Sequence, residues 1–165
     1  MKSPTVRCPV PFEQQPINEY QDMRESWFYS WGARHLRGYI TPILALWSLS
    51  WVVVGPVASA SFAPTKYPAQ FGVSAAVGAL IIPTLALLQL YLGWSYVSDR
   101  LRKQTVPYEE SGWYDGQIWV KPDEVLNRDR LIVDYQIKPI IRRIQKTFGA
   151  LAVLLVTGAI AWQFV

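Results

Sequence analysis

Three long stretches of the chain lack charged side chains, and the polar segments around them separate the elements that the sequence predicts. Residues 38–65, 67–98 and 147–165 contain no Asp, Glu, Lys or Arg, and only Lys66 separates the first two stretches. A helix of about 20 apolar residues crosses the hydrocarbon core of a bilayer. The pattern therefore predicts one membrane-spanning helix in each stretch and excludes a single soluble domain.

The first two predicted spans form an antiparallel hairpin. They cover roughly residues 39–60 and 72–97, and the link between them is too short for a domain. Three prolines lie inside these spans, namely Pro42, Pro56 and Pro83. Because an interior proline deletes a backbone hydrogen bond, we expect these helices to be kinked and to pack against other protein.

The N-terminal segment, residues 1–37, divides into an arm and a helix. Residues 1–17 are rich in proline, which predicts an extended arm that docks on another surface. Asn18 can cap a helix, and bulky side chains then recur every three or four residues. These side chains are Tyr20, Met23, Trp27 and Trp31. The pattern indicates a helix in the lipid headgroup layer or one docked on a partner, and periodicity does not separate the two.

The polar insertion at residues 99–146 begins with a turn signal between two aromatic-rich arms. Asp115 and Gly116 form an Asp-Gly pair, which favours a tight type I′ turn. The sequence therefore predicts a short β-hairpin, with roughly residues 112–115 paired against 116–120.

An amphipathic helix follows the predicted hairpin. Pro122, Asp123 and Glu124 form an N-terminal helix signature. An apolar stripe continues to Ile144, and Pro139 should kink or divide this helix before the third span at residues 147–165.

The predicted fold is an all-α integral membrane protein. It has three transmembrane helices, an N-terminal interfacial helix, and a short β-hairpin plus an amphipathic helix between spans two and three. The predicted segments are residues 1–37, 38–98, 99–146 and 147–165. Fifteen of the 16 Lys and Arg residues fall on the side that holds the first and third segments. The positive-inside rule therefore predicts a cytoplasmic or stromal N-terminus and a C-terminus on the opposite side.

The charge and the reactive residue types exclude several kinds of function. All 12 acidic residues share the side of the 15 basic ones, so no one-sided basic excess suggests a nucleic-acid partner. The single cysteine, Cys8, excludes an intramolecular disulfide. One histidine and one cysteine also exclude a metal site built from several such ligands. No nucleophile elbow or phosphate loop is present, and we expect no enzymatic activity.

Two residues could ligate a pigment or haem, although we predict no bound cofactor. His35, four residues before Tyr39, is placed where an axial ligand to haem iron or chlorophyll magnesium could lie. A solvated or hydrogen-bonded imidazole is the simpler interpretation. Cys8 precedes Pro9, a pair that can bind ferric haem, whereas the simpler interpretation is an extended, proline-rich segment.

Four motifs resemble a known family. They are Cys8–Tyr20, Ser26-Trp27-Phe28, Tyr108–Trp119 and Arg128–Ile132. With these motifs the chain is similar to the small membrane proteins of cyanobacteria and plastids known as chloroplast reading frame 36 and green-lineage-and-diatom protein 27. The resemblance implies a thylakoid location and a connection to oxygenic photosynthesis. It supplies no catalytic residue, because no enzymatic activity is established for the family.

The sequence therefore predicts a non-catalytic thylakoid protein that assists the assembly or maintenance of a photosynthetic complex. Its partners would be membrane lipids and a photosystem or assembly factor. Aromatic and arginine side chains dominate interface energetics, so the predicted docking residues are Trp27, Trp31, Trp113, Tyr114, Trp119, Arg128 and Arg130. Two alternatives are a chlorophyll or haem carrier that uses His35, and a membrane enzyme or transporter for a lipid-soluble substrate.

Overall fold

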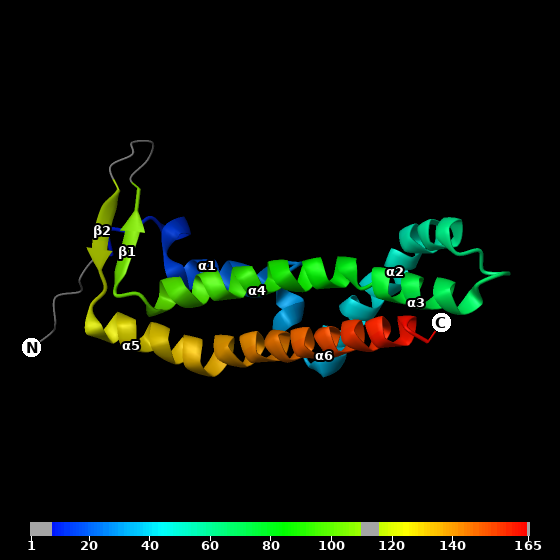
Figure 1. The fold of residues 1–165 in the computed structure, drawn as a ribbon. Coiled ribbons are helices and arrows are strands. Elements are labelled where there is room, and N and C mark those ends of the chain that lie inside the picture. Colours follow the sequence, from blue (N-terminus) through cyan, green and yellow to red (C-terminus); the bar gives the residue numbers. More distant parts are fainter. Residues whose placement is uncertain (1–7, 110–115, 165) are drawn as a thin grey trace, which may run out of the picture. The chain divides into compact units, whose positions relative to one another are not determined.

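The computed structural model describes residues 8–109 and 116–164, and it is mostly helical (Figure 1). The helices are α1 (Pro16–Glu25), α2 (Leu36–Ser61), α3 (Pro68–Gly78), α4 (Ile81–Arg102), α5 (Asp123–Ile132) and α6 (Lys138–Trp162). Shorter helical turns are η1 (Phe12–Gln14), η2 (Ser30–Ala33) and η3 (Val133–Ile137), and the strands are β1 (Thr105–Tyr108) and β2 (Gln117–Val120). The fold is thus consistent with the predicted all-α membrane protein with one small sheet.

Three helical stretches of the described chain are long and apolar enough to cross a membrane. They are Leu36–Ser61, Pro68–Arg102 and Asp123–Trp162. The first two contain the predicted spans 39–60 and 72–97, and the third contains most of the predicted span 147–165. The chain divides into two compact units: unit 1 holds residues 1–30 and 92–141, and unit 2 holds residues 31–91 and 142–165.

The second predicted span is two helices rather than one kinked helix. Helix α3 ends at Gly78 and α4 starts at Ile81, so Pro83 lies in the first turn of a new helix. In a first turn the missing proline N–H costs nothing, because that N–H would have no partner within the helix. Helix α2, by contrast, continues through Pro42 and Pro56 without a break.

The N-terminal helix is shorter than the sequence pattern predicts. Helix α1 begins at Pro16, which occupies its first position, and ends at Glu25. Asn18 is therefore inside the helix and does not cap it. Its side-chain amide donates a hydrogen bond to the Phe12 carbonyl at 2.7 Å, which ties the helix to the preceding arm.

The hairpin uses a different first strand from the predicted one. Strand β1 pairs antiparallel with β2, and Tyr108 faces Gln117 at the end of the ladder. The connection therefore covers residues 109–116 instead of a two-residue turn. The proposed turn residue Asp115 and the predicted strand 112–115 lie outside the described residues, whereas the second predicted strand, 116–120, is close to β2.

Helix α5, the π turn η3 and α6 follow one another without a loop. The interruption predicted at Pro139 is this π turn, which ends two residues before the proline. Proline has no N–H for the carbonyl four residues earlier, so a wider turn at this position is physically reasonable. The last span accordingly begins within a longer helix and ends at Trp162.

Close helix contacts in unit 2 depend on small residues. A Cβ on Gly78 would lie 2.8 Å from Cγ1 of Val54, which is too close for a real contact. Glycine thus allows α3 to approach α2 closely. Near the start of α2, the Tyr39 hydroxyl and the Thr147 hydroxyl lie 2.8 Å apart and join α2 to α6.

Candidate functional site

A buried lysine holds three elements of unit 1 together. The Lys121 ammonium donates to the carbonyls of Arg100 and Leu101 at 3.2 and 3.0 Å, and to Oδ2 of Asp129 at 2.7 Å. The Lys121 and Asp129 side chains are only 0% and 2% exposed. All three ammonium protons therefore have acceptors, as a buried charge requires.

The position of Lys121 follows from the hairpin. Its backbone N–H donates to the Gln104 carbonyl at 2.8 Å, which extends the β-ladder by one bond and places Lys121 at the base of the sheet. There its side chain reaches the last turn of α4, which ends at Arg102. The last carbonyls of a helix lack partners within the helix and carry partial negative charge, so a lysine here satisfies and stabilises them.

Asp129 links the buried Lys121 ammonium to Arg128 at the surface. Its Oδ1 accepts hydrogen bonds from Nε and Nη2 of Arg128 at 3.3 and 3.0 Å. The Arg128 side chain remains 55% exposed. Asp129 thus has both carboxylate oxygens occupied, and it orients one exposed guanidinium at the outer surface of α5.

A small cavity of about 180 Å³ lies beside the Lys121–Asp129 pair. Its lining comes from the N-terminal arm, the start of α1, strand β2 and α5: Cys8, Gln15, Pro16, Ile17, Trp119, Lys121, Val125, Arg128 and Asp129. Seven of these nine residues belong to the sequence motifs, and only Lys121 and Val125 lie outside them. Within the described ranges, no three His, Cys, Asp or Glu side chains gather as a metal site would require.

The N-terminal arm docks on the hairpin of its own chain. Val10 is buried against Val106 and Tyr108, with Cys8 and Trp119 packed around them. The Gln14 side chain donates to the Glu109 carbonyl at 3.1 Å and accepts from the Glu109 N–H at 2.9 Å. This pair of bonds imitates a strand pairing at the end of β1, and it holds the arm without a third strand.

Helix α1 is fastened to α4 by an ion pair and by aromatic packing. Nη1 of Arg100 lies 2.7 Å from Oε1 of Glu19, and its Nη2 donates to the Gln14 carbonyl at 3.0 Å. The rings of Tyr20 and Trp94 meet edge to face with centroids 6.2 Å apart. The Tyr20 hydroxyl also donates to the Gln136 side chain, which links α1 to the π turn η3.

Glu19 makes the stability of unit 1 depend on pH. Its Oε2 is buried without a hydrogen-bond partner among the described residues. Burial raises the pKa of the Glu19 carboxyl above its ordinary value of 4.5, while the Arg100 guanidinium acts in the opposite direction and Asp22 raises it further. The folded state therefore binds more protons than the unfolded state between pH 4.5 and the raised pKa.

We expect the free energy of unfolding to fall as pH rises through this window, and Glu19→Gln to flatten the decline. Thermal unfolding midpoints of the detergent-purified chain across this pH range measure the effect. Glu25→Gln, the same substitution on the exposed last turn of α1, is the control and should follow the wild-type profile. Parallel profiles for wild type and Glu19→Gln would contradict the assignment.

One face of α5 and η3 is open to a partner. Arg128, Leu131 and Tyr135 follow one another at three- and four-residue intervals, so they share a side of the helix. Leu131 is 56% exposed and Tyr135 is 77% exposed. We call these three residues the α5 face. It combines a fixed guanidinium with two large apolar groups, which is the composition of protein interfaces.

The predicted docking residues have different environments. Trp27 is exposed and Arg130 lies on the exposed side of α5. Trp119 is half-buried in the hairpin cluster. Trp31 is buried, and its ring packs on Tyr39 with centroids 5.5 Å apart. Trp113 and Tyr114 lie outside the described residues.

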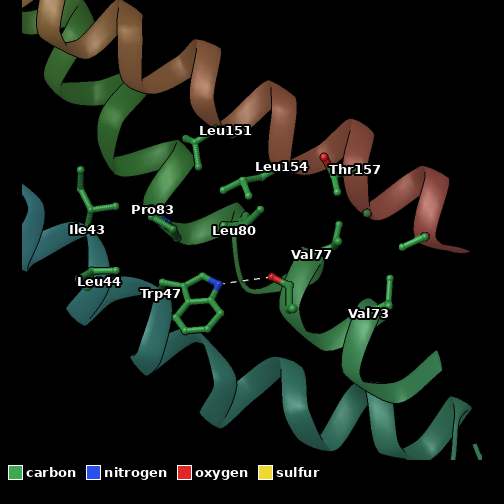
Figure 2. A pocket seen from close by; sticks show the side chains of 13 residues that line it. Ile43, Leu44, Trp47, Val73, Val77, Leu80, Pro83, Leu151, Leu154 and Thr157 are labelled. Atoms are coloured by element: carbon green, nitrogen blue, oxygen red, sulfur yellow. Dashed lines mark hydrogen bonds between the residues drawn. The ribbon is translucent and has the colours of Figure 1, made fainter. Parts of the chain in front are cut away.

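Unit 2 contains an apolar groove of about 430 Å³. Figure 2 shows Leu44 and Trp47 of α2, Val77 of α3, and Leu151 and Leu154 of α6 around it. The indole N–H of Trp47 donates to the Ala76 carbonyl at 3.3 Å. Thr157, the hydroxyl residue of the lining, donates to the Val153 carbonyl at 2.8 Å. These polar groups of the wall are thus already satisfied by backbone carbonyls.

His35 is not part of this groove. It is the exposed N-cap residue of α2, and its side chain makes no capping hydrogen bond. The side chains that line the groove include no His, Cys, Asp or Glu. The groove therefore supplies no side-chain ligand for haem iron or chlorophyll magnesium, and a ligand role for His35 stays a prediction.

Sequence reasoning missed Lys121, whose buried ammonium bonds to the end of α4 and to Asp129 of α5. A lysine directly after a strand ordinarily ends in solvent, and nothing in the local pattern marks this one as buried. The one available signal is Asp129 in the motif Arg128–Ile132, an acidic residue at a position where an amphipathic helix faces inward. That position implies a buried cationic partner without identifying it.

Comparison with known proteins gives one consistent result. The family model described as "CGLD27-like: Conserved in the green lineage and diatoms 27" matches residues 8–150. A chloroplastic protein of that name from Arabidopsis thaliana is 44% identical over 98% of this chain, which spans 50% of that relative's length. Proteins named "Uncharacterized protein ycf36" from Pyropia yezoensis and Cyanophora paradoxa are 43% and 41% identical, and the matches cover 96% and 93% of their lengths. No solved structure matches the chain.

Proposed function

The chain belongs to the CGLD27-like family conserved in the green lineage and diatoms, and we propose that it is a non-catalytic thylakoid membrane protein that assists assembly or maintenance of a photosynthetic complex. A chloroplastic relative and the three long apolar helices support a plastid membrane location. In this proposal the α5 face binds the partner.

The proposal rests on a difference in burial: the charged pair inside unit 1 is buried, whereas the α5 face is exposed. Inside, Lys121 and Asp129 are buried and fully bonded. Outside, Arg128 is held by Asp129 while Leu131 and Tyr135 stay exposed. A side chain that is already positioned loses less conformational entropy when it binds. An exposed face on which Arg128 is held in place by Asp129 therefore favours docking.

The orientation in this proposal follows from the distribution of charge. Fifteen of 16 basic residues belong to residues 1–37 and 99–146. By the positive-inside rule, this distribution supports a stromal or cytoplasmic location for these segments and for the α5 face. The partner would therefore meet this protein from the stromal or cytoplasmic side.

Affinity purification of the full chain from photosynthetic membranes in mild detergent tests the proposal. We expect subunits of a photosystem, or of its assembly machinery, to be recovered with the wild-type chain. Leu131→Glu should reduce this recovery at least tenfold, because it places a charge in an apolar contact. Gln21→Glu adds the same charge at an exposed position on α1 and serves as the matched control.

Recovery of this chain alone, or as a self-oligomer only, would overturn the proposal. Equal recovery of the photosynthetic subunits with wild type and Leu131→Glu would exclude the α5 face as the docking surface. Thermal unfolding of both variants shows whether the fold is intact, and we expect midpoints close to that of the wild type because both positions are exposed.

A further inference from the structure

A second cavity in unit 1 is lined entirely by charged side chains. It has a volume of about 340 Å³ and is formed by Arg102, Arg130, Asp134 and Lys138. We call it the basic cavity. Arg102 ends α4, Arg130 belongs to α5, Asp134 to the π turn η3, and Lys138 begins α6. Three cations and one carboxylate give it a formal charge of +2, which favours the entry of an anion.

Asp134 forms ion pairs with two of these cations, Lys138 and Arg102, and not with Arg130. Its Oδ1 lies 2.6 Å from Nζ of Lys138 and 3.5 Å from Nη2 of Arg102. The hydrogen bond from Lys138 lowers the pKa of the Asp134 carboxyl, so this residue stays ionised at neutral pH. The Arg130 side chain forms no hydrogen bond or ion pair within residues 8–109 and 116–164. Its guanidinium is therefore available to a ligand.

The chemistry of these groups suits a tetrahedral oxyanion. A guanidinium is a planar fork that can bind two oxygens of a phosphate or sulfate group. Arg102 keeps most of its N–H donors, because its contact with Asp134 is long and involves one nitrogen. A doubly charged phosphate ester would balance the charge of the cavity. The volume is near the lower limit of small-ligand sites, which is adequate for a headgroup but not for a large molecule.

The depth of Arg102 indicates where the anion comes from. The apolar run of α4 ends at Val97, and five further residues at 1.5 Å each place Arg102 about 7.5 Å beyond it. The polar headgroup layer extends about 5–8 Å from each side of the hydrocarbon core. The end of α4 thus reaches the depth of lipid phosphates. We propose that the basic cavity binds a phosphate-class anion, supplied by the headgroup of an anionic membrane lipid.

Native mass spectrometry of the full chain in detergent tests this site independently of any protein partner. The probes are short-chain phosphatidic acid, short-chain phosphatidylcholine and inorganic phosphate. We expect phosphatidic acid to bind more tightly than phosphatidylcholine, and Arg130→Ala or Arg102→Ala to weaken it about tenfold. Arg24→Ala removes an exposed arginine of α1 outside the cavity and should leave the affinity unchanged.

The binding site and the source of the anion are tested by separate results. Equal binding of phosphatidic acid by wild type and Arg130→Ala would overturn the basic cavity as the site. Inorganic phosphate that binds as tightly as phosphatidic acid, with the same loss in Arg130→Ala, would overturn the lipid source and assign a soluble phosphate compound. The Arg130 side chain is exposed and has no hydrogen bond or ion pair within the described chain, so we expect Arg130→Ala to fold normally.

Discussion

Asp129→Ala is expected to lower the free energy of unfolding by about 3–5 kcal/mol, because it leaves the Lys121 ammonium buried without a counter-charge. Lys121 is 0% exposed, and its remaining acceptors are two carbonyls at the end of α4. The carbonyls cannot neutralise the ammonium. We therefore expect the hairpin base, the end of α4 and α5 to separate together.

Thermal unfolding of the full chain in detergent measures this loss. Asp134→Ala is the matched control, since Asp134 pairs with Lys138 and Arg102 at an exposed site and its loss should cost at most about 1 kcal/mol. A double variant, Lys121→Met with Asp129→Leu, should recover most of the stability, because an apolar pair of similar volume avoids the uncompensated charge. A loss for Asp129→Ala no larger than that for Asp134→Ala would show that the pair does not hold unit 1 together.

Trp94→Ala is expected to have an effect of similar size, about 3–5 kcal/mol, from the cavity that it leaves. Trp94 is fully buried in α4, packs against Tyr20, and donates from its indole N–H to the Tyr29 carbonyl at 3.3 Å. The preceding residue, Gly93, meets the ring of Tyr29 so closely that a Cβ there would clash. This region is therefore close-packed, and little rearrangement can fill the space.

Limited proteolysis and thermal unfolding together measure the consequence of Trp94→Ala. Cleavage within residues 16–30 should become faster, because this segment loses its main packing partner on α4. Trp27→Ala removes the same side chain from a position that is 87% exposed, and it should change the free energy of unfolding by less than about 0.5 kcal/mol. Equal effects for the two tryptophans would contradict the described packing of α1 on α4.

Trp94 and Lys121 differ in how far their burial can be predicted from the sequence. Trp94 belongs to a long apolar run that the charge pattern identifies, so its burial in a helix is expected from the sequence. Lys121 belongs to a polar segment and follows a strand, where lysine is ordinarily solvated. Its burial depends on the carbonyls of Arg100 and Leu101, about 20 residues earlier in the chain, and on Asp129. No local pattern carries that information.

The errors in the predicted elements have related causes. Periodicity extends the N-terminal helix to Trp31, yet Trp31 packs on Tyr39 in unit 2 while α1 belongs to unit 1. The Asp-Gly pair suggests a tight turn, but strand β1 is set farther back by packing of Val106 on Val10. In both cases a tertiary contact outweighs a local preference of a few tenths to about 1 kcal/mol.

The sequence alone determined the family, the number of long apolar helices and the concentration of charged residues in two segments. It could do so because length, hydrophobicity and extended motifs are properties of contiguous residues. Only the tertiary structure decided that Lys121 and Asp129 form the interior of unit 1, that Leu131 and Tyr135 stay exposed, and that Arg102 and Lys138 share one cavity. Those relationships join residues far apart in the chain, and they arise from how buried charges and helix ends find partners when the chain folds.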